Sequence, residues 1–243
     1  MSKKLLGGSL LTLALGSVVQ SITYLDDSIG EGWDVPSVPY REFISKVKTG
    51  DILLSSSTSA TSWTTRIYTR SLWSHVGIAF YHQNRLYEWS AHNESENIGN
   101  SLNVVCGGPQ LVPIENLVAE SGTLFWKSIS KTEEQERAIA GVVEKLAYKL
   151  EFSNTLEFLS YLGWPFSKMF GGYGGGMACP HIVAATYSAV GMMDLDKDIS
   201  LYTPVDFSDT GDVKWKVPVG LTNMVVGFDA TRLVHIPQLF AKK

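Results

Sequence analysis

Two short apolar runs in the middle of the chain are separated by a polar turn. Residues 73–81 and 86–90 are rich in β-branched and aromatic side chains, a composition that favours strands. Residues 82–85 between them are polar and few, which is typical of a tight connection. The pattern predicts a β-hairpin, and the apolar run at 51–54 predicts another strand upstream of it.

Helical patterns flank these strands. Residues 41–47 predict a short helix, and 131–150 predict an amphipathic helix that is capped by Thr132 and carries an apolar stripe at helical spacing. The stretch 156–170 is strongly apolar and aromatic and also favours helix. The tail, 213–240, alternates apolar runs with Pro and Gly, which predicts further strands.

Residues 1–24 have the features of a targeting or anchoring segment. Lys3 and Lys4 precede the uncharged stretch 5–24, which is apolar with interspersed small residues. A cleaved secretory signal peptide and an uncleaved anchor that attaches the protein to a membrane through residues 5–24 fit this pattern equally well. A third interpretation is an apolar arm buried in an assembly partner.

Composition predicts one ordinary globular domain. The chain has 243 residues, of which 44% are hydrophobic and 18% charged, and it is long enough to bury a substantial core. Residues 25–39 predict a linker, so the domain is expected over 40–243. The net charge of −4 and the absence of a long basic run argue against nucleic acid as a partner. Cys106 and Cys179 belong to no metal-binding spacing, and neither a metal nor a cofactor is predicted.

Cys179 is the candidate nucleophile. It follows a glycine-rich run at 171–176 and precedes Pro180 and an apolar helical stretch, 181–192. Because proline is favoured in the first turn of a helix, the pattern places Cys179 at the N-cap, where the helix dipole favours a thiolate. A buried structural thiol is the alternative, unless a histidine lies beside the cysteine.

The hairpin supplies such a histidine. In an antiparallel pair the numbers of facing residues have a constant sum, and a two-residue loop at 83–84 makes that sum odd. His75 then shares a face with Glu88 and His92, whereas a three-residue loop would separate them. An imidazole that takes a proton from a thiol, oriented by a third polar group, is the arrangement of cysteine hydrolases.

Several short segments occur in an informative order along the chain. They are Gly50-Asp51-Ile52-Leu53, Ser74-His75-Val76-Gly77-Ile78, Tyr87-Glu88, Cys179 with Val183-Ala184, and Thr203-Pro204-Val205-Asp206-Phe207. In order and spacing they resemble the circularly permuted papain-like hydrolases of the NlpC superfamily, which are related to the lecithin retinol acyltransferase group.

This resemblance implies an α+β fold in which an antiparallel sheet or half-barrel packs against the helix bearing the cysteine nucleophile. It also implies that Cys179 is the nucleophile, His75 the general base and Glu88 the residue that orients the imidazole. Some relatives use a second histidine as the third member, which makes His92 the alternative. The implied activities are amide, peptide and (thio)ester hydrolysis or acyl transfer, through an acyl-thioester enzyme whose oxyanion is stabilised by the Cys179 backbone N–H.

The residues after Cys179 depart from the family pattern. Pro180 and His181 stand where the family has a small polar residue and then an acidic or amide residue. Two functions therefore remain open. One is a hydrolase or acyltransferase acting on an amide, peptide or lipid-ester substrate, and the other is an inactive papain-like domain that serves as a membrane-associated or virion assembly component. The intact set of His75, Glu88 and Cys179 favours the enzyme, and a membrane-associated, exported or virion location is expected.

Overall fold

The computed structural model describes most of the predicted domain. The described residues are 35–56, 62, 65–66, 69, 71–92, 108–121, 123–147 and 178–227. The segment 1–24, Cys106 and the stretch 156–170 lie outside them. Within the described ranges, no helix has the length and hydropathy needed to cross a membrane.

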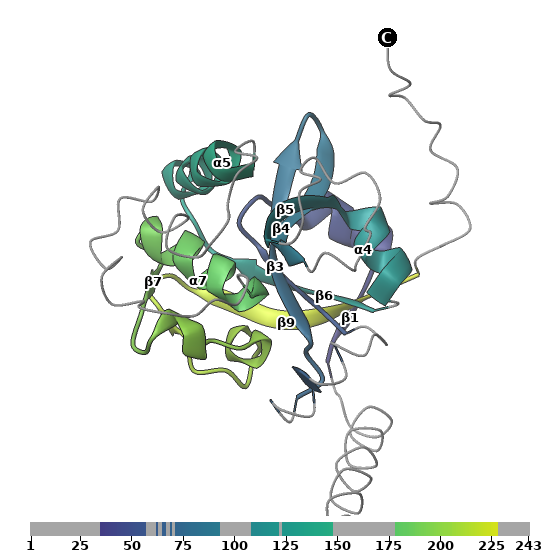
Figure 1. The fold of residues 1–243 in the computed structure, drawn as a ribbon. Helices are drawn as coiled ribbons and strands as arrows, with labels where there is room; N and C mark the ends of the chain where they lie inside the picture. Colours follow the sequence, from purple (N-terminus) through teal and green to yellow (C-terminus); the bar gives the residue numbers. More distant parts are fainter. Residues whose placement is uncertain are drawn as a thin grey trace, which may run out of the picture.

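A seven-stranded, mostly antiparallel sheet forms the centre of the molecule (Figure 1). In spatial order its strands are β1 (Ser37–Pro39), β9 (Val219–Val226), β6 (Leu124–Ile129), β2 (Ile52–Ser55), β3 (His75–His82), β4 (Arg85–His92) and β5 (Gly108–Pro113). β1 is parallel to β9, and all other neighbours are antiparallel. A second sheet pairs β7 (Met193–Asp194) with β8 (Lys214–Trp215). Because β1 belongs to the sheet, the sheet begins within the segment 25–39 that was expected to be a linker.

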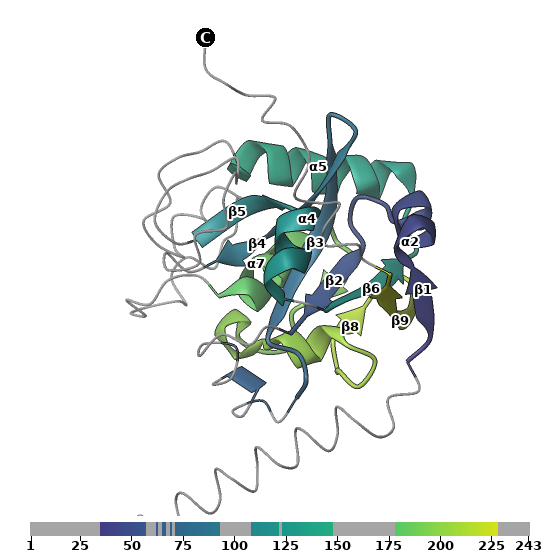
Figure 2. The ribbon, with the colours of Figure 1, turned by 90° about the vertical axis from the view of Figure 1, so that its right-hand side faces the viewer.

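Helices cover both faces of this sheet, as Figure 1 and the turned view in Figure 2 show. α5 (Glu133–Ala147) and α7 (Cys179–Ala189) share a hydrophobic core with Ile52 and Leu54 of β2. α2 (Tyr40–Lys46) and α4 (Ile114–Ser121) share the opposite core with Leu53. The neighbouring residues of β2 thus point to opposite faces and are all apolar, which explains the uninterrupted apolar run in the sequence. The molecule is accordingly α+β, as expected.

The hairpin of β3 and β4 has the two-residue loop on which the predicted pairing depends. Gln83 and Asn84 have φ values of 48° and 64°, the left-handed conformation that a tight hairpin turn of this type requires at both positions. Ile78 pairs with Trp89, so the facing residues have the expected odd sum. The predicted register of the hairpin is therefore confirmed.

The two long helices begin close to the predicted positions. At the start of α5, the backbone N–H of Gln135 donates to Oγ1 of Thr132, and the backbone N–H of Thr132 donates to Oε1 of Gln135. This reciprocal pair confirms Thr132 as the N-cap. In α7 the N-cap is Ala178, so Cys179 is the first helical residue rather than the cap itself. Pro180 still lies in the first turn, where its missing N–H leaves no intrahelical bond unmade.

Asp51, one residue before β2, ties three parts of the fold together. Oδ1 of this buried carboxylate accepts hydrogen bonds from the backbone N–H of Ile129 and the ammonium of Lys131, at 3.2 Å and 2.6 Å. Oδ2 accepts from the backbone N–H of Lys48 at 3.0 Å and the indole N–H of Trp126 at 2.9 Å. The aspartate in the Gly-Asp-Ile-Leu segment therefore holds β2 against β6 and the approach to α5.

Candidate active site

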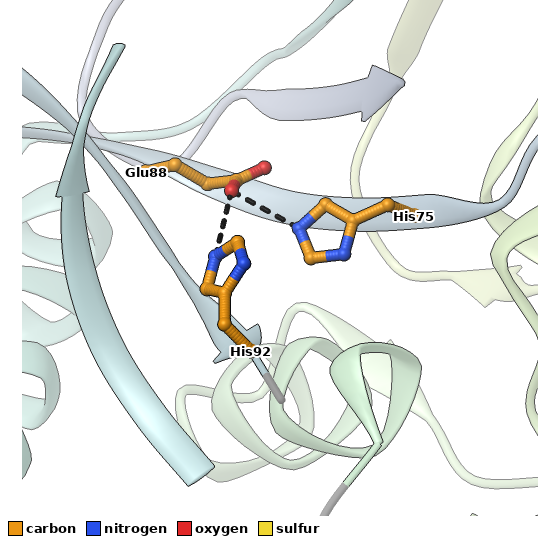
Figure 3. A group of neighbouring side chains, drawn as sticks. All are labelled: His75, Glu88 and His92. Carbon is orange, nitrogen blue, oxygen red and sulfur yellow. Dashed lines mark hydrogen bonds and ion pairs between the residues drawn. The ribbon is translucent and has the colours of Figure 1, made fainter. Parts of the chain in front are cut away.

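His75, Glu88 and His92 lie together on the β3–β4 hairpin, as the confirmed register requires. His75 is the first residue of β3, and Glu88 and His92 lie on β4. The rings of His75 and His92 have centroids 4.6 Å apart, with their planes tilted by 36°. Three of the residues singled out in the sequence are thus neighbours in space (Figure 3).

Glu88 is the centre of this group. Its Oε2 lies 3.0 Å from Nε2 of His75 and 3.2 Å from Nε2 of His92, so one carboxylate oxygen faces both rings (Figure 3). The Glu88 side chain is fully buried and that of His92 is 2% exposed, whereas 16% of the His75 side chain is exposed. His75 is therefore the member of the group that solvent or a substrate can reach.

Gly77 makes room for the Glu88 side chain. Glu88 faces Ala79 in the register, two residues along β3 from Gly77, and must reach back toward His75. A Cβ built on Gly77 would overlap the Cγ and carboxyl group of Glu88. From the sequence, Gly77 was quoted only as part of the Ser-His-Val-Gly-Ile segment and was given no role of its own. The available signal was a glycine inside an apolar strand, which often marks a close approach of another group to the backbone.

Helix α7 is fixed to the strands by buried polar contacts. The indole N–H of Trp89 on β4 donates to Oγ1 of Thr186 at 3.2 Å, and the Tyr187 hydroxyl donates to the Gly50 carbonyl at 3.0 Å. All of these contacts are buried. Because they lie in the middle and last part of α7, they fix the helix axis and with it the position of Cys179 at its first turn.

The thiol of Cys179 meets His75 where α7 and β3 both begin. The two side chains are close enough for Cys179 to raise the pKa of His75 through charge and hydrogen bonding, and Cys179 is half-buried. Since Nε2 of His75 faces Glu88, the ring nitrogen left for the thiol is Nδ1. The structure thus brings together Cys179, His75 and Glu88 in a continuous chain of contacts.

The charges of neighbouring groups affect the protonation of His75 and Glu88. Burial lowers the pKa of His75, but the electrostatic interactions with Glu88 and Cys179, with hydrogen bonds to both, outweigh burial and raise the pKa well above its usual value. Burial raises the pKa of Glu88, but the charges and hydrogen bonds of His75 and His92 lower it to about 2. At neutral pH Glu88 is therefore ionised, and the imidazolium form of His75 is favoured.

His181 turns back on its own helix. Its Nδ1 accepts a hydrogen bond from the backbone N–H of Ala178 at 3.4 Å, which caps the first turn of α7 in place of a side chain on Ala178. Burial lowers the pKa of His181 more than its backbone contact with Ser200 and the charge of Asp198 raise it. His181 thus serves the start of the helix.

No family model and no curated protein matches the sequence. Among solved structures, the chain is similar to the crystal structure of the metalloprotein YiiX (DUF1105) from Escherichia coli O157:H7, with a TM-score of 0.42 and 17% sequence identity. The match covers 74% of this chain and 97% of that one. Likeness at this level establishes neither a shared function nor a shared ligand.

Proposed function

We propose that the protein is a cysteine hydrolase in which Cys179 is the nucleophile, His75 the general base and acid, and Glu88 the group that orients His75. The observation that carries this proposal is the position of His75, which interacts with Cys179 and lies 3.0 Å from Glu88. A thiol, an imidazole and an orienting carboxylate in this sequence of contacts are what nucleophilic catalysis by cysteine needs.

In the proposed reaction His75 gives one proton to the leaving group and later takes one from water. The thiolate of Cys179 attacks the carbonyl carbon of an amide, peptide or (thio)ester, and the His75 imidazolium gives its proton to the leaving group as the acyl-thioester forms. His75, now neutral, accepts a proton from water, whose oxygen attacks the thioester. The acid leaves, and Cys179 is again a thiolate beside the His75 imidazolium. Transfer to an acceptor other than water would make the same enzyme an acyltransferase.

The proposal also assigns roles to a backbone N–H and to a second histidine near Cys179 and His75. The backbone N–H of Cys179 lies in the first turn of α7, where helix N–H groups have no intrahelical acceptor, and we assign it to the oxyanion. His92 contacts the same oxygen of Glu88 as His75 does. We therefore assign Glu88 as the third member and His92 as a positioning residue that holds the carboxylate.

The sheet and α7 also support a permuted papain-like core. In such a core the histidine strand precedes the cysteine helix in the chain, which is the order of β3 and α7 here. The antiparallel strands carry the histidine, and the helix that carries the cysteine packs against them. The fold family, a lipid-ester or peptide substrate and a location at a membrane, outside the cell or in a virion all remain proposals.

Labelling with an electrophilic thiol probe at neutral pH tests the catalytic pair. We expect Cys179→Ser to lose the rapid labelling, and His75→Ala to slow it roughly tenfold or more, because an ordinary thiol is only a few per cent thiolate at pH 7. The matched control is His82→Ala, which removes the histidine at the other end of the same strand and should label normally. Equal rates for the unmodified and His75→Ala proteins would contradict the proposal.

A further inference from the structure

His75, Glu88 and His92 form a group of three metal-ligating side chains. One donor atom from each residue lies within 4.8 Å of the donor atoms of the other two. The residues are separated by 13 and 4 positions in the sequence and come from two paired strands. A compact metal motif is therefore not visible in the sequence, and the hairpin itself assembles the donors.

The distances between the donors suit a small divalent cation. Tetrahedral zinc has ligand bonds of about 2.0–2.2 Å to nitrogen and oxygen, which puts two of its donors roughly 3.3 Å apart. Oε2 of Glu88 lies 3.0 Å and 3.2 Å from the two Nε2 atoms. The two nitrogen donors, which lie within 4.8 Å of each other, would have to adjust their separation for a cation to bind all three groups.

The second oxygen of Glu88 adds an independent observation. Oε1 is buried and has no hydrogen-bond partner among the residues that the structure describes. A buried acceptor without a partner costs about 1–3 kcal/mol, and more when it belongs to a charged group. A cation bound to Glu88 would offset the charge of this buried carboxylate, of which only Oε2 faces the histidines.

The surroundings of His75 fit the same role. Metal-bound histidines usually form a hydrogen bond through their other ring nitrogen, which fixes the orientation of the ring. In His75 that nitrogen faces Cys179. The exposed 16% of the His75 side chain gives a cation an entry route to an otherwise buried group.

We propose that His75, Glu88 and His92 bind a divalent transition-metal cation such as Zn²⁺, through two imidazole nitrogens and one carboxylate oxygen, with a fourth position left open. Two nitrogen donors favour Zn²⁺ or Co²⁺ over Mg²⁺, which prefers oxygen ligands. The site goes beyond the proposed hydrolase, and cation binding can be measured without turnover. Because the cation takes the place of the proton on Nε2 of His75, a protein with metal bound and a protein with the His75 imidazolium are alternative states.

Calorimetric titration with Zn²⁺ tests the site directly. The titrated protein is the full chain with Cys179→Ser, so that the thiol cannot supply the binding. We expect this protein to bind Zn²⁺, and adding His92→Ala or Glu88→Gln to weaken binding at least about tenfold, because even partners outside the ligand set change metal affinity 10- to 100-fold. His82→Ala in the same background should bind normally, and Mg²⁺ should not compete.

Thermal unfolding provides a second readout that controls for folding of the variants. Zn²⁺ should raise the unfolding temperature of Cys179→Ser, because a ligand that binds only the folded state stabilises it, and should have little effect after His92→Ala is added. The absence of Zn²⁺ binding to Cys179→Ser would overturn the inference. Equal affinity with and without His92 would overturn it as well.

Discussion

Glu88 is held between two histidines on one side and a glycine on the other. Gly77→Ala places a methyl group where the Glu88 side chain lies. We expect this change to lower the free energy of unfolding by about 1–3 kcal/mol, as overpacking does in cores, and to slow labelling of Cys179 because Glu88 no longer orients His75. Urea unfolding and the thiol probe measure the two effects.

Two further variants show whether the effect arises from Glu88. Gly141→Ala is the matched control, because its added methyl group meets nothing within 4 Å on α5. In the double variant Gly77→Ala/Glu88→Ala the overlap is removed, so the two changes should be non-additive by about 1 kcal/mol or more. Additive losses would mean that Gly77 acts on stability through something other than Glu88.

The sequence predicted which residues share a face, but not how their side chains meet. Alternation along β3 and β4 required only the length of the turn, so His75, Glu88 and His92 were found together. The shared Oε2 of Glu88 depends on side-chain conformations, which strand periodicity does not determine. The capping of α7 by His181 was missed for the same reason, since Nδ1 of a first-turn histidine can point either toward a substrate or toward its own backbone.

At the scale of elements, a buried ion pair joins β2 to the segment before α5. Asp51→Asn keeps the shape of the side chain but leaves the ammonium of Lys131, whose side chain is 2% exposed, without a carboxylate. Breaking a buried pair in this way typically costs about 3–5 kcal/mol, and we expect a loss near the lower end because the asparagine oxygen still accepts hydrogen bonds. Chemical denaturation measures the loss.

The control for this prediction is an ion pair at the surface. Glu42→Gln breaks the pair with Lys46, whose side chain is 58% exposed, and should change the free energy of unfolding by no more than about 1 kcal/mol. Equal losses of unfolding free energy from Asp51→Asn and Glu42→Gln would mean that the buried contacts of Asp51 do not stabilise the fold more than a surface ion pair does.

Local signals predicted the elements better than their exact ends. The cap at Thr132 and the apolar stripe located α5, and the turn residues located the hairpin. Cys179 was predicted to be the N-cap of α7 but is its first helical residue, because proline is compatible with more than one position in a first helical turn. The pairing of β1 with β9 could not be predicted, because short strands far apart in the chain carry no signal of their partner.

At the scale of the whole molecule, two partly exposed carboxylates near the C-terminal strands link stability to pH. Asp209 lies 3.0 Å from the ammonium of Lys127 on β6 and accepts the backbone N–H of Thr222 on β9. Burial raises the pKa of Asp209, but the hydrogen bonds from Thr222 and Lys127 lower it below its usual value. Asp206, which is paired with Lys197, likewise has a lowered pKa, because the hydrogen bonds from Lys197 and Thr203 outweigh burial.

A lowered carboxyl pKa makes the folded state more sensitive to acid. The contribution is complete above the unfolded pKa of about 3.9 and is lost as the pH falls through the lower folded pKa, because the unfolded chain binds protons first. We expect the free energy of unfolding to decrease as the pH drops below about 4, and we expect Asp209→Asn to make this decrease smaller. Urea titrations at neutral pH and at about pH 3 measure it.

Asp194→Asn is the control for this pH dependence. It breaks a pair with Lys216 in which both side chains are about half exposed or more, at 61% and 49%, so the slope should stay that of the unmodified protein. If Asp209→Asn left the change of unfolding free energy with pH unaltered, the acid sensitivity would arise from other carboxylates.

The turn at Gln83 and Asn84 has a consequence for how this chain can diverge. These residues are exposed and lie at the opposite end of β3 from His75, yet their number decides which face of β4 each side chain occupies. Loss or gain of a single residue there would leave a hairpin with the same composition and turn Glu88 and His92 away from His75. Within the residue types that accept a left-handed backbone, the side chains of this turn can therefore change, whereas its length cannot change without separating the site residues. An exposed turn is thus as constrained in length as the buried site residues are in identity.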